Sequence, residues 1–507
     1  MQQIDRSRRR KWGLVALAFL PLFMALAFNG TRGLWGTDEG RYVDGGLQML
    51  RMDDFLRIHL NPEYPHFTKP PVTYWAIAGS IAAFGQNESA ARLPNALAFW
   101  GTSLLLLLAG RLIGLRAPWV PMLLYATTLF TFFAANAVTT DTLLALFTTL
   151  AGVSFLALYL GKRPRLAAVA MWSGFGLAFM TKGPPGLLPL LAFNLFLVFN
   201  RDWSRLKTMW WSWGIPAFLL IGFSWYAALV LTTPGLLDYF IHDEVVGRVA
   251  SNEFGRHGQW YGAIVAYLPV WIFGALPWGY FLLFARKRAE TPEDSRAEVS
   301  RLLAWWVLVP FVIFVLARSR LPIYTLQLFA PATLWLSLRL EPLLRRPWPR
   351  WGYALVALWI AGAVGFKAWA AHYDDYGRDA RALAQEIVDK AGNDFQEIVF
   401  VNMMPKWGLT FYLNEDVEET WLGSPRERPS FAPVQSLPQE LAEGRAEAFS
   451  DWLFVVRPPD RERFEQTVHE SGRGFEFMGE LKENDDQLLY RVDTAAGAGA
   501  ASDPGSQ

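Results

Sequence analysis

Long apolar runs occupy most of the chain up to about residue 370. Runs that reach or approach the length of a membrane span lie at about 12–30, 90–110, 117–136, 142–160, 165–181, 183–199, 209–231, 262–284, 302–317, 322–338 and 351–370. Because a helix needs about 20 apolar residues to cross the hydrocarbon core, the pattern predicts a mainly α fold. We expect a polytopic helical membrane protein with about eleven transmembrane helices and additional juxtamembrane helices.

One further apolar run, at 70–86, decides the orientation of everything that follows it. If this run does not cross the membrane, the segments on the same side of the membrane as the N-terminus contain 22 Lys and Arg. The loops on the opposite side are longer but contain only 10. Positively charged loops stay in the cytoplasm, so a non-crossing run is favoured. We therefore predict that residues 70–86 form a juxtamembrane or re-entrant helix that starts at two prolines. The N-terminus is expected in the cytoplasm and the C-terminus in the periplasm. The first apolar run is expected to remain as an uncleaved signal-anchor.

After residue 371 the sequence becomes too polar for a bilayer. Helical spacing of apolar residues at 378–391 and 461–471 alternates with short apolar runs at 397–402 and 451–456, and 475–481 with 487–492 has the pattern of a hairpin. We expect a small soluble periplasmic α/β domain at 372–494, after a transmembrane domain at 1–371 in which 31–89 is a periplasmic catalytic loop. The tail at 495–507, rich in Ala, Gly and Ser, is predicted to be disordered.

The composition agrees with a membrane protein and excludes several classes of function. Apolar residues make up 52% of the chain and charged residues only 18%, a mixture typical of a polytopic membrane protein. The net charge of +1 gives no indication of nucleic-acid binding. The chain contains no cysteine, which excludes disulfides and thiolate chemistry. No glycine-rich nucleotide loop is evident, so a cytoplasmic enzyme using a sugar nucleotide is disfavoured.

The first candidate for chemistry is a pair of adjacent carboxylates, Asp38 and Glu39, directly after the first apolar run. Charges this close to hydrocarbon usually have a function, and a carboxylate here is suited to take a proton from an acceptor hydroxyl. The alternative is that Thr37 or Asp38 caps a surface helix. Downstream, Lys69 precedes two prolines, and a lysine beside a helix N-terminus favours binding of a phosphate.

Further ionisable groups fall at the same predicted outer face. Lys182 also precedes two prolines, and like Lys69 it is a candidate for binding a phosphate; the alternative is that it only snorkels to the membrane interface. Asp141 begins an apolar run, where it is either a pocket residue or a helix cap. Glu244 and Arg248 have an i,i+4 spacing and are able to pair on one helix. Other polar residues of this face are His257, Arg318, Arg320 and Tyr324. A metal site built from His66, His242 and His257 is disfavoured because their spacing is not that of ligands.

Three motifs together give the chain a specific resemblance. Asp-Glu-x-Arg-Tyr (38–42), Lys-Pro-Pro-x-x-Tyr-Trp (69–75) and Asn-Glu-Ser-Ala-Ala-Arg-Leu-Pro (87–94) resemble membrane glycosyltransferases of the GT-C type. Among these, the chain is most similar to the bacterial aminoarabinose transferase and dolichyl-phosphate-mannose-protein mannosyltransferase-like family. The resemblance covers about residues 31–330, since Asp141, Lys182 and the 244–257 loop follow in the family's usual order.

The resemblance implies transfer of a glycosyl group from a polyprenyl-phosphate-linked sugar to lipid A, another glycan or a protein, at the periplasmic face of the bacterial inner membrane. The expected stereochemical outcome is inversion. Residues expected at the catalytic step are Asp38, Glu39 and Asp141. Residues expected to bind the donor phosphate are Lys69, Arg248 and Lys182. Residues expected to line the pocket are Arg41, Tyr42, Tyr74, Glu88, Glu244, His257 and Tyr324.

Two further expectations concern a cation and a rival function. The family often has an acidic residue before the lysine, but this chain has Thr68 there, which puts a divalent cation held by that carboxylate in doubt. A divalent cation stays possible, but no cofactor is expected to be required. A transporter or flippase of an anionic lipid-linked sugar is the alternative function. It is disfavoured because a transporter should show two repeated halves and charges near mid-membrane.

Overall fold

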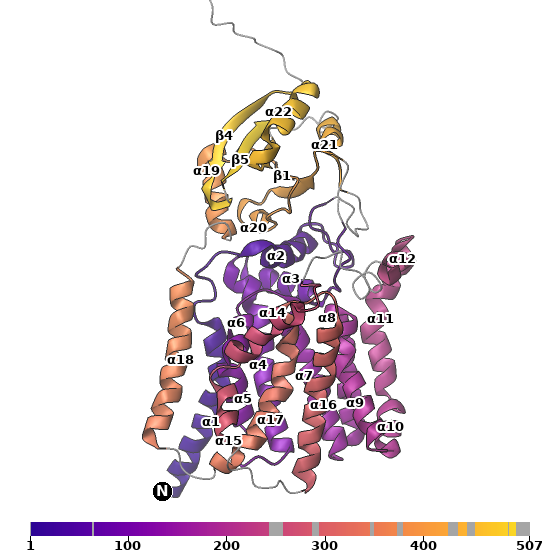
Figure 1. Cartoon of the computed structure of the whole chain (residues 1–507), viewed down its shortest axis with the longest axis vertical. Coiled ribbons are helices and arrows are strands. Elements are labelled where there is room, and N and C mark those ends of the chain that lie inside the picture. Colours follow the sequence, from indigo (N-terminus) through magenta and orange to yellow (C-terminus); the bar gives the residue numbers. More distant parts are fainter. Residues whose placement is uncertain are drawn as a thin grey trace, which may run out of the picture. The chain divides into compact units, whose positions relative to one another are not determined.

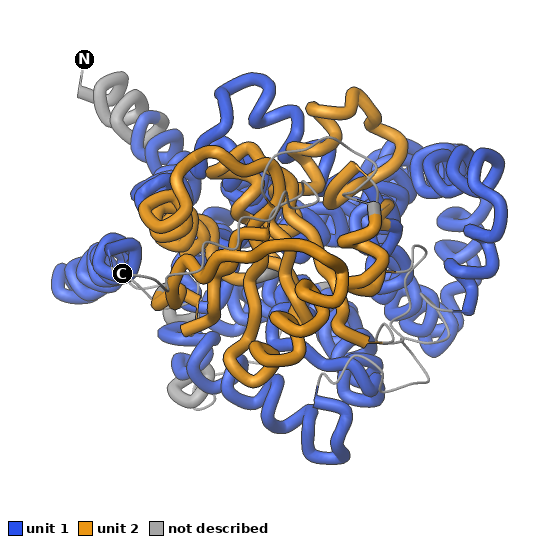
Figure 2. Tube along the Cα trace, turned by 90° about the horizontal axis from the view of Figure 1, so that it is seen from above, with its two compact units in different colours: residues 1–31, 67–372 blue, residues 32–66, 373–507 orange. Residues whose placement is uncertain are grey.

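The computed structural model describes residues 2–62, 65–242, 257–285, 294–344, 349–372, 379–423, 434–443, 452–484 and 486–492. It divides into two compact units, drawn in different colours in Figure 2. The first unit comprises residues 1–31 and 67–372, and the second comprises residues 32–66 and 373–507. The predicted catalytic loop at 31–89 is therefore split, because residues 32–66 fold with the C-terminal residues rather than with the apolar helices.

The described part of the first unit is built from helices (Figure 1). Five of them are long and apolar enough to cross a membrane: Glu88–Leu112 (α4), Thr140–Tyr159 (α7), Gly214–Thr232 (α11), Arg296–Leu316 (within α16, Asp294–Leu316) and Arg350–Ala370 (α18). The other principal helices are α1 (Gln2–Leu26), α8 (Pro164–Lys182), α9 (Leu188–Phe199), α10 (Trp203–Trp210) and α17 (Leu326–Leu344). The total of about eleven spans stays a prediction.

The core of the first unit lies around α7, which packs against α8, α4 and α17. At 1.5 Å per residue its 20 residues extend about 30 Å, the thickness of a hydrocarbon core. Aromatic side chains fill the interior, and the stacked rings of Phe155 and Phe193, with centroids 4.2 Å apart, join α7 to α9. Such ring pairs add about 0.5–1.5 kcal/mol beyond the area that they bury.

Two apolar runs that the sequence presents as continuous are interrupted. The run at 117–136 forms α5 (Val120–Thr127) and α6 (Leu129–Ala134), because Thr128 between them is extended. The run at 262–284 forms α14 (Gly262–Pro269), the π-helical η3 (Val270–Gly274) and α15 (Trp278–Ala285). The Leu129 N–H donates to the Leu276 carbonyl at 2.9 Å, so one backbone hydrogen bond joins the two interruptions. Each run was counted as one predicted membrane span, and the structure shows that neither is a single continuous helix.

The predicted non-crossing helix at 70–86 corresponds to α3 (Val72–Phe84). Its 13 residues extend about 20 Å, which is less than the roughly 30 Å of a hydrocarbon core. Pro71 lies directly before its first residue, as the sequence indicated. A helix of this length is too short to cross the membrane alone.

The second unit contains a five-stranded sheet in the order β2-β1-β3-β5-β4. The strands are β1 (Glu397–Val401), β2 (Asp416–Thr420), β3 (Trp452–Val456), β4 (Phe475–Leu481) and β5 (Gln487–Val492). β1 is parallel to β2 and β3, whereas β5 is antiparallel to β3 and β4. The predicted helices are α19 (Ala380–Ala391) and α22 (Arg461–Glu470), and the predicted terminal hairpin is β4–β5; all three are confirmed.

Alternation along the central strands gives this sheet two apolar faces. On β1, Ile398 and Phe400 join the core beneath α19, whereas Val399 and Val401 join the core beneath α22. Both faces are therefore covered, as is usual for a sheet with parallel strands. The helix α2 (Gly36–Arg51) and the segment that follows it, up to residue 66, complete this unit.

Candidate active site

In the first unit, Asp141 and Lys182 form a buried ion pair. The Lys182 Nζ lies 2.6 and 2.7 Å from the two carboxylate oxygens of Asp141, and the side chains are 10% and 6% exposed, respectively. Thr139 caps α7 by accepting from the Asp141 N–H at 3.3 Å. Asp141 is therefore not the cap itself but lies in the first turn, where the helix dipole favours a carboxylate.

Lys182 is the last residue of α8 and not the residue before a helix N-terminus. Gly183 ends α8 with φ +72°, and Pro184 then begins the short 3-10 helix η1 (Pro184–Leu187). The Lys182 Nζ also lies 4.3 Å from the ring centroid of Tyr324, on the 3-10 helix η5 (Pro322–Thr325). Since its ammonium is held by a carboxylate and an aromatic face, Lys182 is not a snorkelling lysine. Three predicted site residues thus meet in one place.

Lys69 lies in the loop that precedes α3, in the first unit. Its side chain is half-buried, and its Nζ donates to the Thr68 carbonyl at 3.0 Å. The sequence placed this lysine beside a helix N-terminus, and the structure agrees, because only Pro70 and Pro71 separate it from α3. That position supports binding of an anion, since the N–H groups of the first turn and the ammonium have the same sign of charge.

The acidic pair belongs to the second unit and lies in the first turns of α2. Asp38 is 57% exposed and is paired with Arg41 at 2.6 Å, three residues later. The residue at the cap position is Trp35, and no side chain caps the helix, so the capping role considered for Asp38 is wrong. The Arg41 guanidinium lies 5.5 Å from the ring centroid of Tyr42.

Glu39 has a different environment from Asp38, although the two are adjacent. It is 4% exposed, and its Oε2 accepts from the Trp35 N–H and from Arg32 Nη1, each at 2.7 Å. The Arg32 guanidinium also lies 4.4 Å from the Trp35 ring centroid. Glu39 therefore organises the start of α2, and its carboxylate is engaged with the protein. No sequence pattern indicated Arg32, since an arginine seven residues before a glutamate has no helical relation to it.

The remaining predicted residues occupy varied positions. Tyr42 in the second unit and Tyr74 in the first are buried, and Glu88 begins α4 directly after Asn87, whose side chain caps that helix. The carbonyls of His257 and Gln259 accept from Arg320 Nη1 at 2.8 and 2.7 Å. Glu244 and Arg248 lie outside the described residues.

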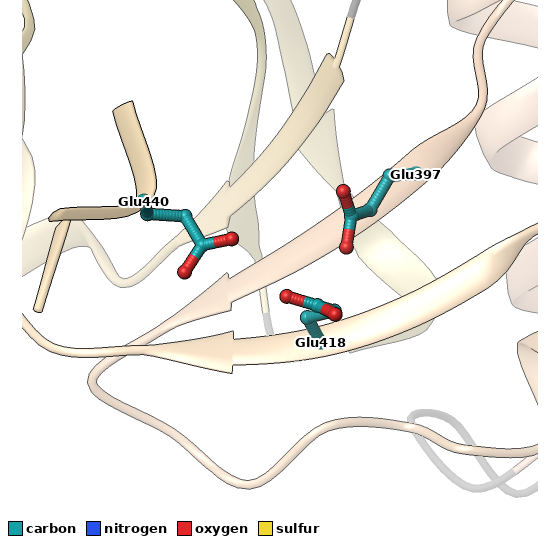
Figure 3. A group of neighbouring side chains, drawn as sticks. All are labelled: Glu397, Glu418 and Glu440. Carbon is teal, nitrogen blue, oxygen red and sulfur yellow. The ribbon is translucent and has the colours of Figure 1, made fainter. Parts of the chain in front are cut away.

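One acidic group in the second unit has the spacing of metal ligands. Glu397, Glu418 and Glu440 each place a carboxylate oxygen within 4.8 Å of the others, and within the described ranges no other such group of three is found (Figure 3). Burial, and then the neighbouring Glu397 and Glu440, raise the pKa of Glu418 well above its ordinary value. A carboxyl group whose pKa is raised in this way retains its proton more readily than an ordinary glutamate, which lowers the charge repulsion within the group. The predicted histidines do not belong to this group.

The raised pKa of Glu418 predicts that the second unit becomes less stable as pH rises. The unfolded chain loses this proton near the ordinary value of 4.5, whereas the folded chain retains it, so the folded state binds more protons. The free energy of unfolding therefore falls by up to about 1.4 kcal/mol per pH unit from about pH 6 to about pH 9. Glu418→Gln should flatten this slope, measured as hydrogen exchange of β2 amides corrected for intrinsic rates.

In the Glu418→Gln variant, the free energy of unfolding should still fall as pH rises, but less steeply. Burial also raises the pKa of Asp44, a fully buried carboxylate on α2, and its contribution has the same sign. Equal slopes in the wild type and in Glu418→Gln would show that Glu418 does not carry the extra proton of the folded state.

Comparison with known proteins places these features in context. Residues 68–228 match the family model described as dolichyl-phosphate-mannose-protein mannosyltransferase. The undecaprenyl phosphate-alpha-4-amino-4-deoxy-L-arabinose arabinosyl transferase 2 of Pseudomonas fluorescens is 31% identical over 347 residues, 66% of this chain and 61% of that protein. The transferase of the same name from Proteus mirabilis is 28% identical over 64% of this chain and 59% of its own length. The chain thus spans about three fifths of the length of these relatives.

A solved structure extends the likeness to nearly the whole chain. ArnT from Cupriavidus metallidurans, in a crystal structure with bound undecaprenyl phosphate, has a TM-score of 0.75 and 21% identity, covering 97% of this chain and 99% of that one. The fold is therefore ArnT-like, of the GT-C type. The arabinofuranosyltransferase AftD from Mycobacteria, with a TM-score of 0.54 and 14% identity, covers 97% of this chain and 40% of its own.

These comparisons confirm the predicted fold class, a mainly helical polytopic membrane protein with a small C-terminal sheet region, and the predicted resemblance to aminoarabinose transferases.

Proposed function

We propose that this chain transfers a glycosyl group from a polyprenyl-phosphate-linked sugar to lipid A, another glycan or a protein. The observation that carries the proposal is the fold likeness over 97% of the chain to a protein whose crystal structure holds undecaprenyl phosphate. The relatives' names supply the first donor to test, an undecaprenyl-phosphate-linked 4-amino-4-deoxy-L-arabinose. The ionisable residues to which the sequence assigned roles supply the chemistry of the proposed reaction.

In the proposed reaction an acceptor oxygen attacks the anomeric carbon as the bond from that carbon to the phosphate oxygen breaks. Asp38 takes the proton of an acceptor hydroxyl, or orients the acceptor if it is itself an anion. The polyprenyl phosphate leaves with one more negative charge than it had in the donor. Direct displacement inverts the anomeric centre, since no sugar–enzyme bond is formed.

The growing charge of the leaving phosphate needs fixed cations, and stabilisation of this kind is usually the largest catalytic contribution. We assign Lys69, Lys182 and Arg248 to this role. Asp141 and Tyr324 hold Lys182 in place, as their contacts with its ammonium indicate. Proposed pocket residues without an assigned step are Arg41, Tyr42, Tyr74, Glu88, Glu244 and His257. For Glu39 we propose a positioning role, since its carboxylate is engaged by Arg32 and Trp35.

Purified protein incubated with a panel of radiolabelled undecaprenyl-phosphate sugars and with lipid A, glycan or protein acceptors tests the proposal. We expect a labelled acceptor with inverted anomeric configuration, formed with the aminoarabinose donor. Failure of every donor to label any acceptor, together with movement of the intact donor across proteoliposomes, would instead support a transporter or flippase.

We also propose that the protein lies in the bacterial inner membrane with its N-terminus in the cytoplasm and its C-terminal domain in the periplasm. The unequal distribution of Lys and Arg supports this orientation. Since the chain has no cysteine, single cysteines serve as reporters. In intact spheroplasts, Arg318→Cys and Glu476→Cys should react with an impermeant thiol reagent, whereas Lys162→Cys should react only after lysis. All three side chains are exposed. The reverse pattern would overturn the orientation.

A further inference from the structure

The helix that carries Asp38 is built into the C-terminal fold. Just before α2, the Leu34 N–H donates to the Tyr412 hydroxyl and the Leu34 carbonyl accepts from the Ala380 N–H, both at 2.9 Å. At the other end of α2, Arg51 Nη2 donates to Asn414 Oδ1 at 3.1 Å. Both ends of α2 are thus tied to residues more than 340 positions later in the chain.

The middle of α2 is fixed by direct backbone packing. Gly40 faces Gly408, which directly precedes α20 (Leu409–Leu413). A Cβ atom at Gly40 would lie 2.5 Å from the Gly408 nitrogen and 2.9 Å from its Cα, closer than real side chains approach. Because the obstacle is backbone rather than a flexible side chain, any residue other than glycine at position 40 must displace one of the two segments.

The N-terminal turn of α2 is fixed from within the same unit. Glu39 accepts hydrogen bonds from the Trp35 N–H and the Arg32 guanidinium, and Arg32 itself stacks on Trp35. None of these contacts involves the Asp38 side chain, which is 57% exposed. They affect Asp38 only by fixing the backbone of α2. The position of the Asp38 carboxylate is therefore set by where the C-terminal fold places α2.

We propose that the C-terminal α/β fold acts in sugar transfer as the scaffold that positions Asp38, with Gly40, Gly408 and Tyr412 as positioning residues. The inference rests on the proposed function, in which Asp38 acts on the acceptor. Positioning affects the chemical step, and a misplacement of about 1 Å is able to cost about 100-fold in rate. Binding of the donor phosphate is assigned to residues of the first unit, which these substitutions do not touch.

The test compares two variants of the interface with two matched controls in the full-length protein. Gly40→Ala should lower kcat by about 10- to 100-fold while the KM for the undecaprenyl-phosphate sugar changes by less than about twofold. Tyr412→Phe, which removes one hydrogen-bond acceptor, should lower kcat by about fivefold with the same unchanged KM. It keeps the test valid if Gly40→Ala fails to fold.

The controls make the same chemical changes elsewhere. Gly79→Ala places a methyl group on α3 with no atom within 4 Å, and Tyr490→Phe removes a 2.7 Å hydrogen bond to Glu465 on another part of the C-terminal fold. Both should retain wild-type kcat and KM. Wild-type kcat in folded Tyr412→Phe, or an equal loss in Tyr490→Phe, would overturn the positioning role.

The outcomes also separate this inference from the proposed function. If Asp38→Asn keeps normal turnover, the catalytic role of Asp38 fails whatever the interface variants do. If Asp38→Asn is inactive but Tyr412→Phe and Gly40→Ala both turn over normally, only the positioning role fails.

Discussion

Asp38→Asn is expected to lower the rate of sugar transfer by about 10²- to 10⁴-fold, the usual contribution of a general base. The amide keeps the shape of the carboxylate but does not accept the proton of an acceptor hydroxyl. Folding should be preserved, because the Asp38 side chain is 57% exposed and its pair with Arg41 is an i,i+3 surface contact, a kind worth at most about 1 kcal/mol. The measurement is the initial rate with a labelled undecaprenyl-phosphate sugar.

A matched control is available in the same unit. Asp460 is paired with Arg457 at 2.7 Å, also three residues apart, and lies before α22. Asp460→Asn makes the same chemical change in a similar ion pair and should leave the rate unchanged. Near-normal turnover by Asp38→Asn would remove Asp38 from the catalytic step.

Lys182→Met is expected to impair both folding and transfer, the second large effect. It leaves the 6% exposed carboxylate of Asp141 without its ammonium partner, and breaking a buried pair in this way costs about 3–5 kcal/mol. Because Lys182 is also proposed to bind the donor phosphate, the KM for the donor should rise. The midpoint of thermal unfolding at a fixed scan rate and the steady-state constants measure the two effects separately.

The double variant Asp141→Asn/Lys182→Met separates structure from function. With both charges removed, most of the lost stability should return, but transfer should stay low. Arg296→Met is the matched control, because it removes the guanidinium partner of the buried Glu341 in the same unit, leaving the Arg116 N–H as a hydrogen-bond donor to that carboxylate, and involves no proposed site residue. It should destabilise the protein without changing the donor KM. Wild-type transfer by the stable double variant would restrict Asp141 and Lys182 to a structural role.

The elements that the sequence predicted well are those with regular apolar spacing. In the C-terminal fold, α19, α22 and the β4–β5 hairpin follow from local periodicity. The strand β2 was missed because it reads Asp-Val-Glu-Glu-Thr, and its Glu418 is buried against expectation. The interruptions at Thr128 and before α15 were missed because the sequence stays apolar through them, and the hydrogen bond that joins them links segments distant in the sequence.

The candidate site was predicted unevenly for a similar reason. Chemistry and motif order picked out Asp141 and Lys182 individually, and the structure pairs them across α7 and α8. Sequence reasoning made Asp38 the candidate base, assisted by Glu39, but did not indicate how different their environments are: Asp38 is exposed, whereas Glu39 is buried and paired with Arg32. Nor did any local pattern indicate that 32–66 folds with residues after 372, since that depends on contacts between distant segments.

That long-range docking has a consequence for biogenesis. During synthesis, the hydrogen bond of Leu34 forms only after Tyr412 has been made, 378 residues later. The hydrogen bond of Asn61 likewise needs Glu418, 357 residues later. At about 5–20 residues per second, synthesis of the intervening chain takes roughly 20 to 80 s. During that interval α2 lacks its permanent neighbours. The protein is therefore expected to complete the proposed catalytic helix α2 among the last steps of its maturation, so a chain truncated near its end should accumulate as inserted but inactive protein.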